Sequence, residues 1–344
     1  MSLTSHIRKT VEISLRKPLV AFLEVNGKMN PSQHGFRSRR SCLSQLLEHY
    51  DNILKILEQG HNADCVYLDF SKCFDKIDIG LLSHKLKQNK IHSKLGTWLH
   101  NFLVDRKQHI VVDNEMSNSS NVVSGIPQGT VLGPVLALIF LSDLDEGIEN
   151  IASMFADDTR IMSAVQEDTD VETLQKDLDH IYKWAEENNM KFNSDKFELL
   201  RYGRNEELKE NTIYFSADNN IVGEKEVLRD LGIMVNNEAN FDHHIEKVCK
   251  TVKQKSGWIL RTFRCRKPYV LKLLWKSLVQ PNIDYCSQLY MPVNGNKLNQ
   301  LESLQRQFTN RIPSANSMDY WARLGHLQIL SQLRRLERYR IIYT

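Results

Sequence analysis

The spacing of apolar residues along the chain changes between a helical and a strand-like period. Apolar side chains recur every fourth residue over 3–15, which predicts an amphipathic helix that ends near Lys17-Pro18. Helical spacing returns over 43–50 and 171–184, and it dominates from Phe241 to 308. The carboxyl-terminal third is therefore predicted to be helical.

Short apolar runs between these segments have the composition of strands. They cover 66–68, 108–113, 197–200 and 228–235, the last as one strand with Gly232 inside it. Two more, at 151–156 and 161–164, flank Asp157-Asp158 and predict two strands joined by a tight acidic turn. Strands and helices are mixed in this order, and the chain shows no internal repeat.

Adjacent carboxylates at such a turn permit two interpretations. Held ~4 Å apart, Asp157 and Asp158 repel each other by roughly 4 kcal/mol at an effective dielectric near 20, which a bound cation would relieve. Aspartate is also a common turn residue, so a solvated hairpin is the alternative. This stretch alone does not separate a metal site from a solvent-exposed turn.

Three regions of the 344-residue chain differ strongly in charge, although the net charge is only +3. Residues 1–50 carry 8 basic and 3 acidic side chains, residues 51–240 carry 19 and 33, and residues 241–344 carry 18 and 6. An acidic centre between basic arms suits a protein that binds cations centrally and polyanions peripherally. Solvated helix faces are the alternative for the carboxyl-terminal charges.

Cysteine spacing and hydropathy indicate the setting of the protein. Six cysteines without a C-x-x-C pair argue against a zinc knuckle and a disulfide scaffold, and favour an intracellular setting, nuclear or cytoplasmic. The most apolar run, 131–141, is too short to span a bilayer, so no membrane segment is expected. Composition does not indicate an oligomeric state.

Three further segments carry candidate chemistry. The basic loop over 32–41, which includes Arg37, precedes a helix and suits phosphate, although it could lack a ligand. Asp69 follows a buried strand, either as a functional acid or as a helix cap. The glycine-rich turn over 124–134 allows close approach of a ligand to its backbone, and Gln128 offers a donor and an acceptor.

In this order, the motifs resemble those of a reverse transcriptase, in particular the polymerase of jockey-like non-LTR retrotransposons. Their sequences are Gln-His-Gly-Phe-Arg at 33–37, Leu-Asp-Phe-Ser-Lys-Cys-Phe-Asp at 68–75, Ser-Gly-Ile-Pro-Gln-Gly at 124–129, Phe-Ala-Asp-Asp at 155–158, the turn at Lys196, and Asp-Leu-Gly at 230–232. The similarity extends over nearly the whole chain.

The resemblance implies an α+β protein with the right-hand polymerase fold, which has an antiparallel palm sheet, partial fingers and a helical thumb. The corresponding segments are partial fingers over 1–60, a palm with the catalytic motifs over 61–240, and a basic thumb with a carboxyl-terminal extension over 241–344. The implied activity is RNA-directed DNA polymerisation, in which deoxynucleotides are added to a primer 3′-hydroxyl. The implied partners are an RNA template, a DNA primer and deoxynucleoside triphosphates.

The resemblance also implies roles at the acidic centre. Asp69 and Asp157 would bind two Mg²⁺ ions, or alternatively Mn²⁺, and Asp158 would complete the acidic cluster. Lys196 would donate a proton to pyrophosphate.

Other motif positions are expected to contact the nucleotide or the primer. Phe74 would exclude a 2′-hydroxyl, with a core aromatic as the alternative, and Phe70 would also bind the nucleotide. Gln128 and Gly129 would contact the template base and the incoming nucleotide, and Arg37 the template or triphosphate. Leu231 and Gly232 would form the primer grip. The full set is Arg37, Phe70, Phe74, Gln128, Gly129, Leu231 and Gly232.

Two departures from the family pattern affect these expectations. Phe155 and Cys73 stand where the family often has Tyr and Ala, away from the metal chemistry. Residues that the family has before Met1 are missing, so we expect an amino-terminally truncated chain with fewer phosphate contacts. The alternative function is therefore an impaired relic that binds RNA or RNA–DNA hybrid without polymerising.

Overall fold

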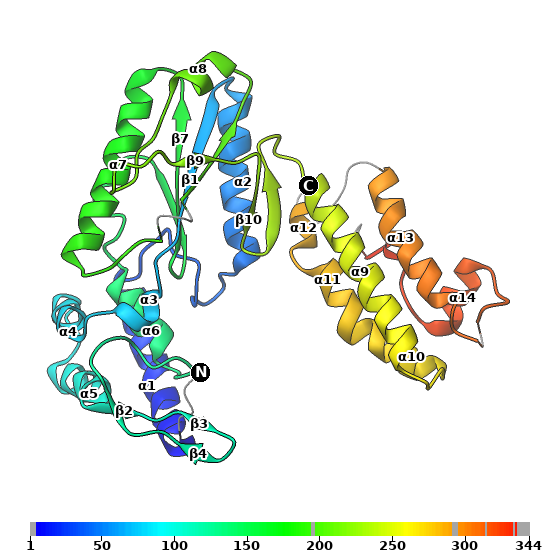
Figure 1. Cartoon of the computed structure of the whole chain (residues 1–344), viewed down its shortest axis with the longest axis horizontal. Helices are drawn as coiled ribbons and strands as arrows, with labels where there is room; N and C mark the ends of the chain where they lie inside the picture. Colours follow the sequence, from blue (N-terminus) through cyan, green and yellow to red (C-terminus); the bar gives the residue numbers. More distant parts are fainter. Residues whose placement is uncertain (1–4, 194–196, 291–294, 314, 333, 336–344) are drawn as a thin grey trace. The chain divides into compact units, whose positions relative to one another are not determined.

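A computed structural model describes residues 5–193, 197–290, 295–313, 315–332 and 334–335 (Figure 1). The chain divides into two compact units, with the division between Lys225 and Glu226. Each unit has its own hydrophobic core. None of the helices in the described part of the chain is long and apolar enough to cross a bilayer.

The first unit begins with two helices, α1 (His6–Val25) and α2 (Cys42–Glu58). The prediction that the first helix ends near Pro18 is wrong, because α1 continues seven residues further. Pro18 removes one hydrogen bond, but Leu19 and Leu23 beyond it are buried in the core, and their burial favours continuation. Ser41 caps α2 by accepting a hydrogen bond from the N–H of Ser44.

A five-stranded sheet forms the centre of this unit, in the order β6-β7-β1-β8-β9. The strands are β1 (Asn62–Leu68), β6 (Ile151–Phe155), β7 (Asp158–Val165), β8 (Glu198–Tyr202) and β9 (Gly223–Glu224). Both neighbours of β1 run antiparallel to it, and only β8 and β9 are parallel. The strands predicted around Asp157-Asp158 and over 197–200 are thus confirmed as β6, β7 and β8.

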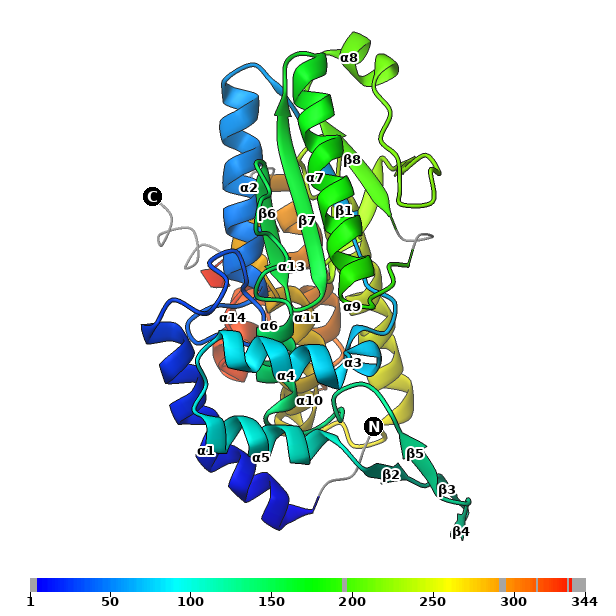
Figure 2. The same cartoon turned by 90° about the vertical axis from the view of Figure 1, so that its left-hand side faces the viewer.

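Helices cover both faces of this sheet (Figures 1 and 2). The helix α7 (Asp168–Glu187) packs on β7, and α2 packs on β1 and β6. Alternate residues of β1 face the two sides: Val66 belongs to the core that includes α7, while Tyr67 contacts His49 of α2. Because both faces are covered, β1 is an almost continuously buried strand.

Short elements complete the first unit. They are α3 (Cys73–Lys76), α4 (Ile79–Gln88), α5 (Ser93–Leu103), β2 (Arg106–Gln108), β3 (Val111–Val112), β4 (Glu115–Met116), β5 (Ser120–Val122), α6 (Gly133–Phe140) and α8 (Glu206–Asn211). The strand predicted over 108–113 is wrong in extent. It is divided between β2 and β3, and Asp113 and Asn114 form a turn with positive φ that reverses the chain.

The second unit starts with a hairpin and continues as helices. The hairpin consists of β10 (Val227–Asp230) and β11 (Ile233–Asn236). The prediction of one strand over 228–235 is therefore wrong, because Leu231 and Gly232 both have positive φ and turn the chain back.

The helical character predicted from Phe241 onward is confirmed. The elements are α9 (Asp242–Thr262), α10 (Pro268–Leu274), the π-helical turn η2 (Trp275–Val279), α11 (Gln280–Asp284), α12 (Ser287–Tyr290), α13 (Gly295–Thr309) and α14 (Tyr320–Leu327). Their core contains Val252 of α9 and the rings of Trp275 and Phe308, whose centroids are 4.8 Å apart. The mixture of sheet and helix confirms the predicted α+β class.

Candidate active site

The three predicted acids lie at one end of the five-stranded sheet. Asp69 directly follows β1, Asp157 lies in the turn between β6 and β7, and Asp158 is the first residue of β7. In the antiparallel pair of β1 and β7, Leu68 lies opposite Thr159. The next residues outward, Asp69 and Asp158, therefore leave this pair at the same sheet end. Asp69 and Asp157 are half-buried, and Asp158 is exposed.

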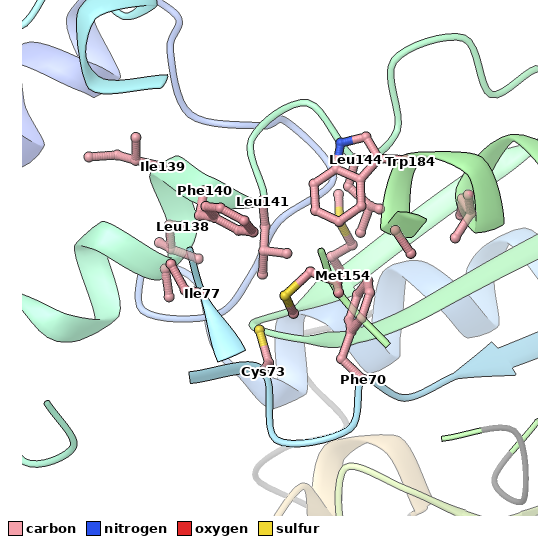
Figure 3. Close-up of a cluster of buried hydrophobic side chains, with 14 of the residues drawn as sticks. Phe70, Cys73, Ile77, Leu138, Ile139, Phe140, Leu141, Leu144, Met154 and Trp184 are labelled. Atoms are coloured by element: carbon pink, nitrogen blue, oxygen red, sulfur yellow. The ribbon is translucent and has the colours of Figure 1, made fainter. Parts of the chain in front are cut away.

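A buried thiol is affected by two of these acids. Cys73, the first residue of α3, is 1% exposed and lies close to Met154 and Phe70 in the core (Figure 3). Burial raises the pKa of the Cys73 thiol, and the negative charges of Asp157 and Asp69 raise it further.

The donor chemistry of this sheet end fits a hard divalent cation. Among the residues that the structure describes, no group of three or more His, Cys, Asp or Glu side chains is arranged to hold a metal ion. Mg²⁺ is usually bound by one or two carboxylates together with substrate phosphates, and not by an all-protein cage. Two half-buried carboxylates, Asp69 and Asp157, fit that mode of binding.

The glycine-rich turn at 124–129 is hydrogen-bonded to the segment that follows Asp69. The N–H of Gly125 donates to the carbonyl of Ile77 (2.8 Å), and the N–H of Ile126 donates to that of Phe74 (2.7 Å). Gly125 has φ +79°, and a Cβ there would lie 2.6 Å from the carbonyl oxygen of Asp75. Glycine is therefore required for the close approach.

These hydrogen bonds bring three predicted nucleotide-binding residues, Phe74, Gln128 and Gly129, into neighbouring segments. Nε2 of Gln128 donates to Oδ1 of Asp75 (3.0 Å), next in sequence to Phe74. Gly129 is exposed with φ +88°. The half-buried ring of Phe74 meets Phe36 edge-on, with 6.5 Å between centroids.

Phe70 is placed differently from these residues. Its ring stacks on Phe192 with 4.3 Å between centroids, meets Trp184 edge-on, and is 3% exposed. The side chain therefore belongs to the core, so a contact between Phe70 and a nucleotide would have to come from its main chain.

The segment that leads to Lys196 runs beside Asp69. The N–H of Asn193 donates to the Asp69 carbonyl (2.9 Å), and the N–H of Ser71 donates to the Lys191 carbonyl (2.8 Å). Lys196 itself lies outside the described residues.

Arg37 makes an ion pair inside the first unit. Its Nε and one terminal nitrogen donate to the two carboxylate oxygens of Glu24, at 3.0 and 2.6 Å. The other terminal nitrogen donates to the Asn30 carbonyl (2.6 Å), and the side chain is 11% exposed. In this conformation Arg37 supports its own loop, and contact with a phosphate would require the pair to open. Its predicted nucleotide contact stays a prediction.

The predicted primer-grip residues lie in the second unit, at the tip of the β10–β11 hairpin. Leu231 has φ +43° and Gly232 φ +91°. The Tyr285 hydroxyl donates to the Leu231 carbonyl (2.7 Å), and its ring lies 3.3 Å from where a Cβ of Gly232 would be. One tyrosine thus holds this turn.

Two buried polar residues near the start of the chain were not predicted. Glu12 of α1 is fully buried, and its Oε2 accepts from the N–H groups of Val131 (2.6 Å) and Leu132 (3.1 Å), just before α6. Gln33 hydrogen-bonds the backbone of Ala156, the residue before Asp157. The signal for Glu12 was an acid among the apolar positions of an amphipathic helix.

Comparisons with known proteins agree with this arrangement. A family model described as "Reverse transcriptase (RNA-dependent DNA polymerase)" matches residues 1–235. The RNA-directed DNA polymerase from the mobile element jockey of Drosophila melanogaster is 26% identical over 328 residues, which cover 91% of this chain and 35% of the relative. A probable RNA-directed DNA polymerase from the transposon X-element of the same species is 24% identical over 326 residues, with the same coverage of both chains.

A solved structure supports the fold. Apo telomerase from Candida tropicalis superposes with a TM-score of 0.53 at 10% identity, covering 94% of this chain and 55% of that one. The predicted right-hand polymerase fold is thereby confirmed. The chain spans about a third of the length of the curated relatives it matches. On the family match over 1–235 and the order of its motifs, the chain belongs to the reverse transcriptase family.

Proposed function

We propose that this chain extends a DNA primer on an RNA template, as an RNA-directed DNA polymerase domain of a non-LTR element. One observation carries the proposal: Asp69 and Asp157, far apart in sequence, lie at the same end of one sheet in a chain of the reverse transcriptase family. Proteins of this family generally use divalent metal ions.

The acidic sheet end would hold the cations. Asp69 and Asp157 would bind two Mg²⁺ ions, with Mn²⁺ as a substitute, and the exposed Asp158 would complete the cluster. When bound, such ions supply Lewis-acid stabilisation of the triphosphate and of the attacking oxygen. The carboxylates themselves would hold and orient the cations.

The segments beside this end of the sheet would select the nucleotide. Phe74 would pack against the sugar and exclude a 2′-hydroxyl, and Gln128 with Gly129 would contact the base pair that forms. Phe70 would contribute its main chain. Arg37 would contribute only after release from Glu24.

The remaining roles concern pyrophosphate and primer. Lys196 would protonate the leaving pyrophosphate, and Leu231 with Gly232 would hold the primer. On this view, residues 1–60 are partial fingers, 61–240 the palm, and 241–344 the thumb and its extension.

Primer extension on an RNA template with Mg²⁺ tests the proposal. We expect incorporation by the wild-type chain and a loss of about a thousandfold in Asp157→Asn, which corresponds to roughly 4 kcal/mol of transition-state stabilisation. Asp218→Asn, an exposed aspartate in a loop of the same unit, is the matched control and should retain full activity. Soluble wild-type protein without Asp157-dependent incorporation would contradict the proposal.

A second candidate function, RNA or RNA–DNA hybrid binding without polymerisation, is favoured by the second unit. Residues 241–344 carry a net charge of +12, and a cleft between α9 and α13 is lined by Lys253, Arg311 and amide side chains. Arg261 and Arg264 are exposed, whereas Arg266 donates to the Leu260 carbonyl.

Charge reversal of the two exposed arginines tests this candidate. Arg261→Glu with Arg264→Glu should lower RNA affinity and reduce the slope of log affinity against log salt by about 2. If RNA affinity and its salt dependence stay at the wild-type values, the second unit does not bind RNA through this segment.

A further inference from the structure

The residue before Asp157 has an unusual backbone conformation. Ala156 has φ +58° and is buried, 9% exposed. A left-handed conformation costs an L-residue other than glycine about 1–2 kcal/mol, so it persists only where other contacts hold it. The direction in which the following carboxylate points depends on this conformation.

The amide of Gln33 pairs with both backbone groups of Ala156. Its Oε1 accepts from the N–H of Ala156 (2.7 Å), and its Nε2 donates to the carbonyl of Ala156 (2.9 Å). Oε1 also accepts from the N–H of Gly35 (2.7 Å). If the amide were reversed, the Gln33 NH₂ group would face the N–H groups of Ala156 and Gly35, which are donors as well. These partners therefore specify the orientation of the amide. The Gln33 side chain is buried, 3% exposed.

Backbone hydrogen bonds on either side of Gln33 also join this segment to the strand before the turn. The N–H of Met154 donates to the Ser32 carbonyl (2.9 Å), and the N–H of His34 donates to the Met154 carbonyl (2.8 Å). The segment thus pairs with β6, the strand at the edge of the sheet. A Cβ on Gly35 would lie 2.4 Å from the backbone nitrogen of Ala156, so glycine is needed for this approach.

We propose that Gln33 is a positioning residue: by holding Ala156 in the left-handed conformation, it sets the orientation of the Asp157 carboxylate and thereby the affinity of the site for divalent cations. The inference rests on the cation site of the proposed function, and cation binding can be measured separately from polymerisation. Gln33 touches neither substrate nor cation in this role. It acts through the backbone of the turn.

Side-chain shape and hydrogen bonding can be separated at this position. Gln33→Met keeps the length and volume of the side chain and removes all three hydrogen bonds. Gln33→Ala removes the side-chain volume as well as the three hydrogen bonds. Gln45→Ala is the matched control, because Gln45 of α2 is also fully buried in the first unit, and its amide makes no hydrogen bond to the turn within the part of the chain that the structure describes.

Binding of Mn²⁺ alone to the full chain, followed by electron paramagnetic resonance, is the primary measurement. The wild-type chain should bind Mn²⁺, and Asp157→Asn should abolish this binding. Gln33→Met and Gln33→Ala should both weaken that binding about tenfold, while Gln45→Ala stays within twofold of wild type. Thermal denaturation of each variant shows whether it is folded.

Primer extension provides the second measurement. Both Gln33 variants should lower kcat about tenfold or more and raise the half-saturating Mg²⁺ concentration, with primer–template Kd within twofold of wild type. A residue that only supported the fold would lower Tm in Gln33→Ala and be rescued in Gln33→Met.

The outcomes separate this inference from the proposed function. If wild type binds Mn²⁺ through Asp157 but does not polymerise, the proposed function fails and the Mn²⁺ affinities still decide the role of Gln33. If Gln33→Met binds Mn²⁺ and polymerises as wild type does, the inference is overturned and the function stands. Wild type without Asp157-dependent Mn²⁺ binding overturns the inference as well.

Discussion

Two hairpin turns with predicted functions are built in contrasting ways. At the β6–β7 turn, the N–H of Ala156 donates to the buried amide of Gln33 and its carbonyl accepts from that amide, and Gly35 packs directly against its backbone. At the β10–β11 turn, Leu231 receives one hydrogen bond from Tyr285, whose side chain is 44% exposed. Both turns have positive φ, but only the first is enclosed.

The contrast agrees with what each turn is proposed to do. A turn that orients metal ligands benefits from several buried contacts that fix a single conformation. A turn that grips a primer must release it after each addition, and one contact at the surface permits small adjustments. The four predictions below test this difference, in order of decreasing expected effect.

Gly35→Ala should have the largest effect, because the new Cβ would meet the backbone of Ala156 and force β6 and residues 32–35 apart. We expect a loss of about 3 kcal/mol in the free energy of unfolding and at least a hundredfold loss of primer extension. Urea denaturation and extension assays measure both. Gly96→Ala, in helix α5 with open space around it, should leave both unchanged or raise stability slightly.

Glu12→Ala tests whether the glycine-rich turn is also held by a buried side chain. The substitution leaves the N–H groups of Val131 and Leu132 without their buried acceptor, and we expect a loss of about 2–3 kcal/mol in urea denaturation. Glu12→Gln retains an acceptor and should lose about half as much. Equal stability of wild type and Glu12→Ala would show that this end of α6 does not need the carboxylate.

His244 should make the stability of the β10–β11 hairpin depend on pH. It accepts a hydrogen bond from the N–H of Met234 in β11 (3.3 Å), and burial, with a smaller effect of Lys247, lowers its pKa to about 4. The unfolded chain therefore takes up a proton near pH 6.5 that the folded chain does not. Stability contributed by neutral His244 is complete above pH 6.5 and falls by roughly 2 kcal/mol between pH 6.5 and 5.

Urea midpoints of the full chain at pH 7 and pH 5 measure this loss. His244→Gln should remove that part of the pH dependence, while His243→Gln, an exposed neighbour on the same helix, should keep it. Identical pH profiles of wild type and His244→Gln would contradict the assignment.

Tyr285→Phe should have the smallest effect, below about 1 kcal/mol, because it removes one hydrogen bond at the surface. We expect a twofold to fivefold decrease in the length of DNA made per binding event and no change in Mn²⁺ binding. Tyr269→Phe, in which an exposed tyrosine of α10 is altered, is the control. A tenfold or larger loss would mean that the second turn is as constrained as the first.

Local patterns predicted the elements whose determinants lie within a few residues. The apolar runs around Asp157-Asp158 predicted β6 and β7, and the acid after a buried strand located Asp69. The strand over 228–235 was wrong because alternation of apolar residues continues through Leu231, whose positive φ follows from a hairpin held by Tyr285, 54 residues away.

Polar residues that act across long separations could not be found in this way. Gln33 lies 123 positions before Ala156, and Glu12 lies 119 before Val131. Arg37 was expected to face phosphate because its loop is basic, but its partner Glu24 lies on the preceding helix. Which donor meets which acceptor depends on packing of the whole unit, which periodicity does not encode.

Pairing of residues 32–34 with β6 has a consequence for solubility. β6 is the last strand on its side of the sheet, and an uncovered edge of this kind presents free N–H and C=O groups to other chains. On that edge, the N–H of Met154 donates to the Ser32 carbonyl, and the Met154 carbonyl accepts from the N–H of His34. Pro31, just before these residues, has no N–H to donate to an approaching strand. The amino-terminal segment thus protects the sheet from edge-to-edge aggregation, and its removal would expose a surface on which a second molecule could pair.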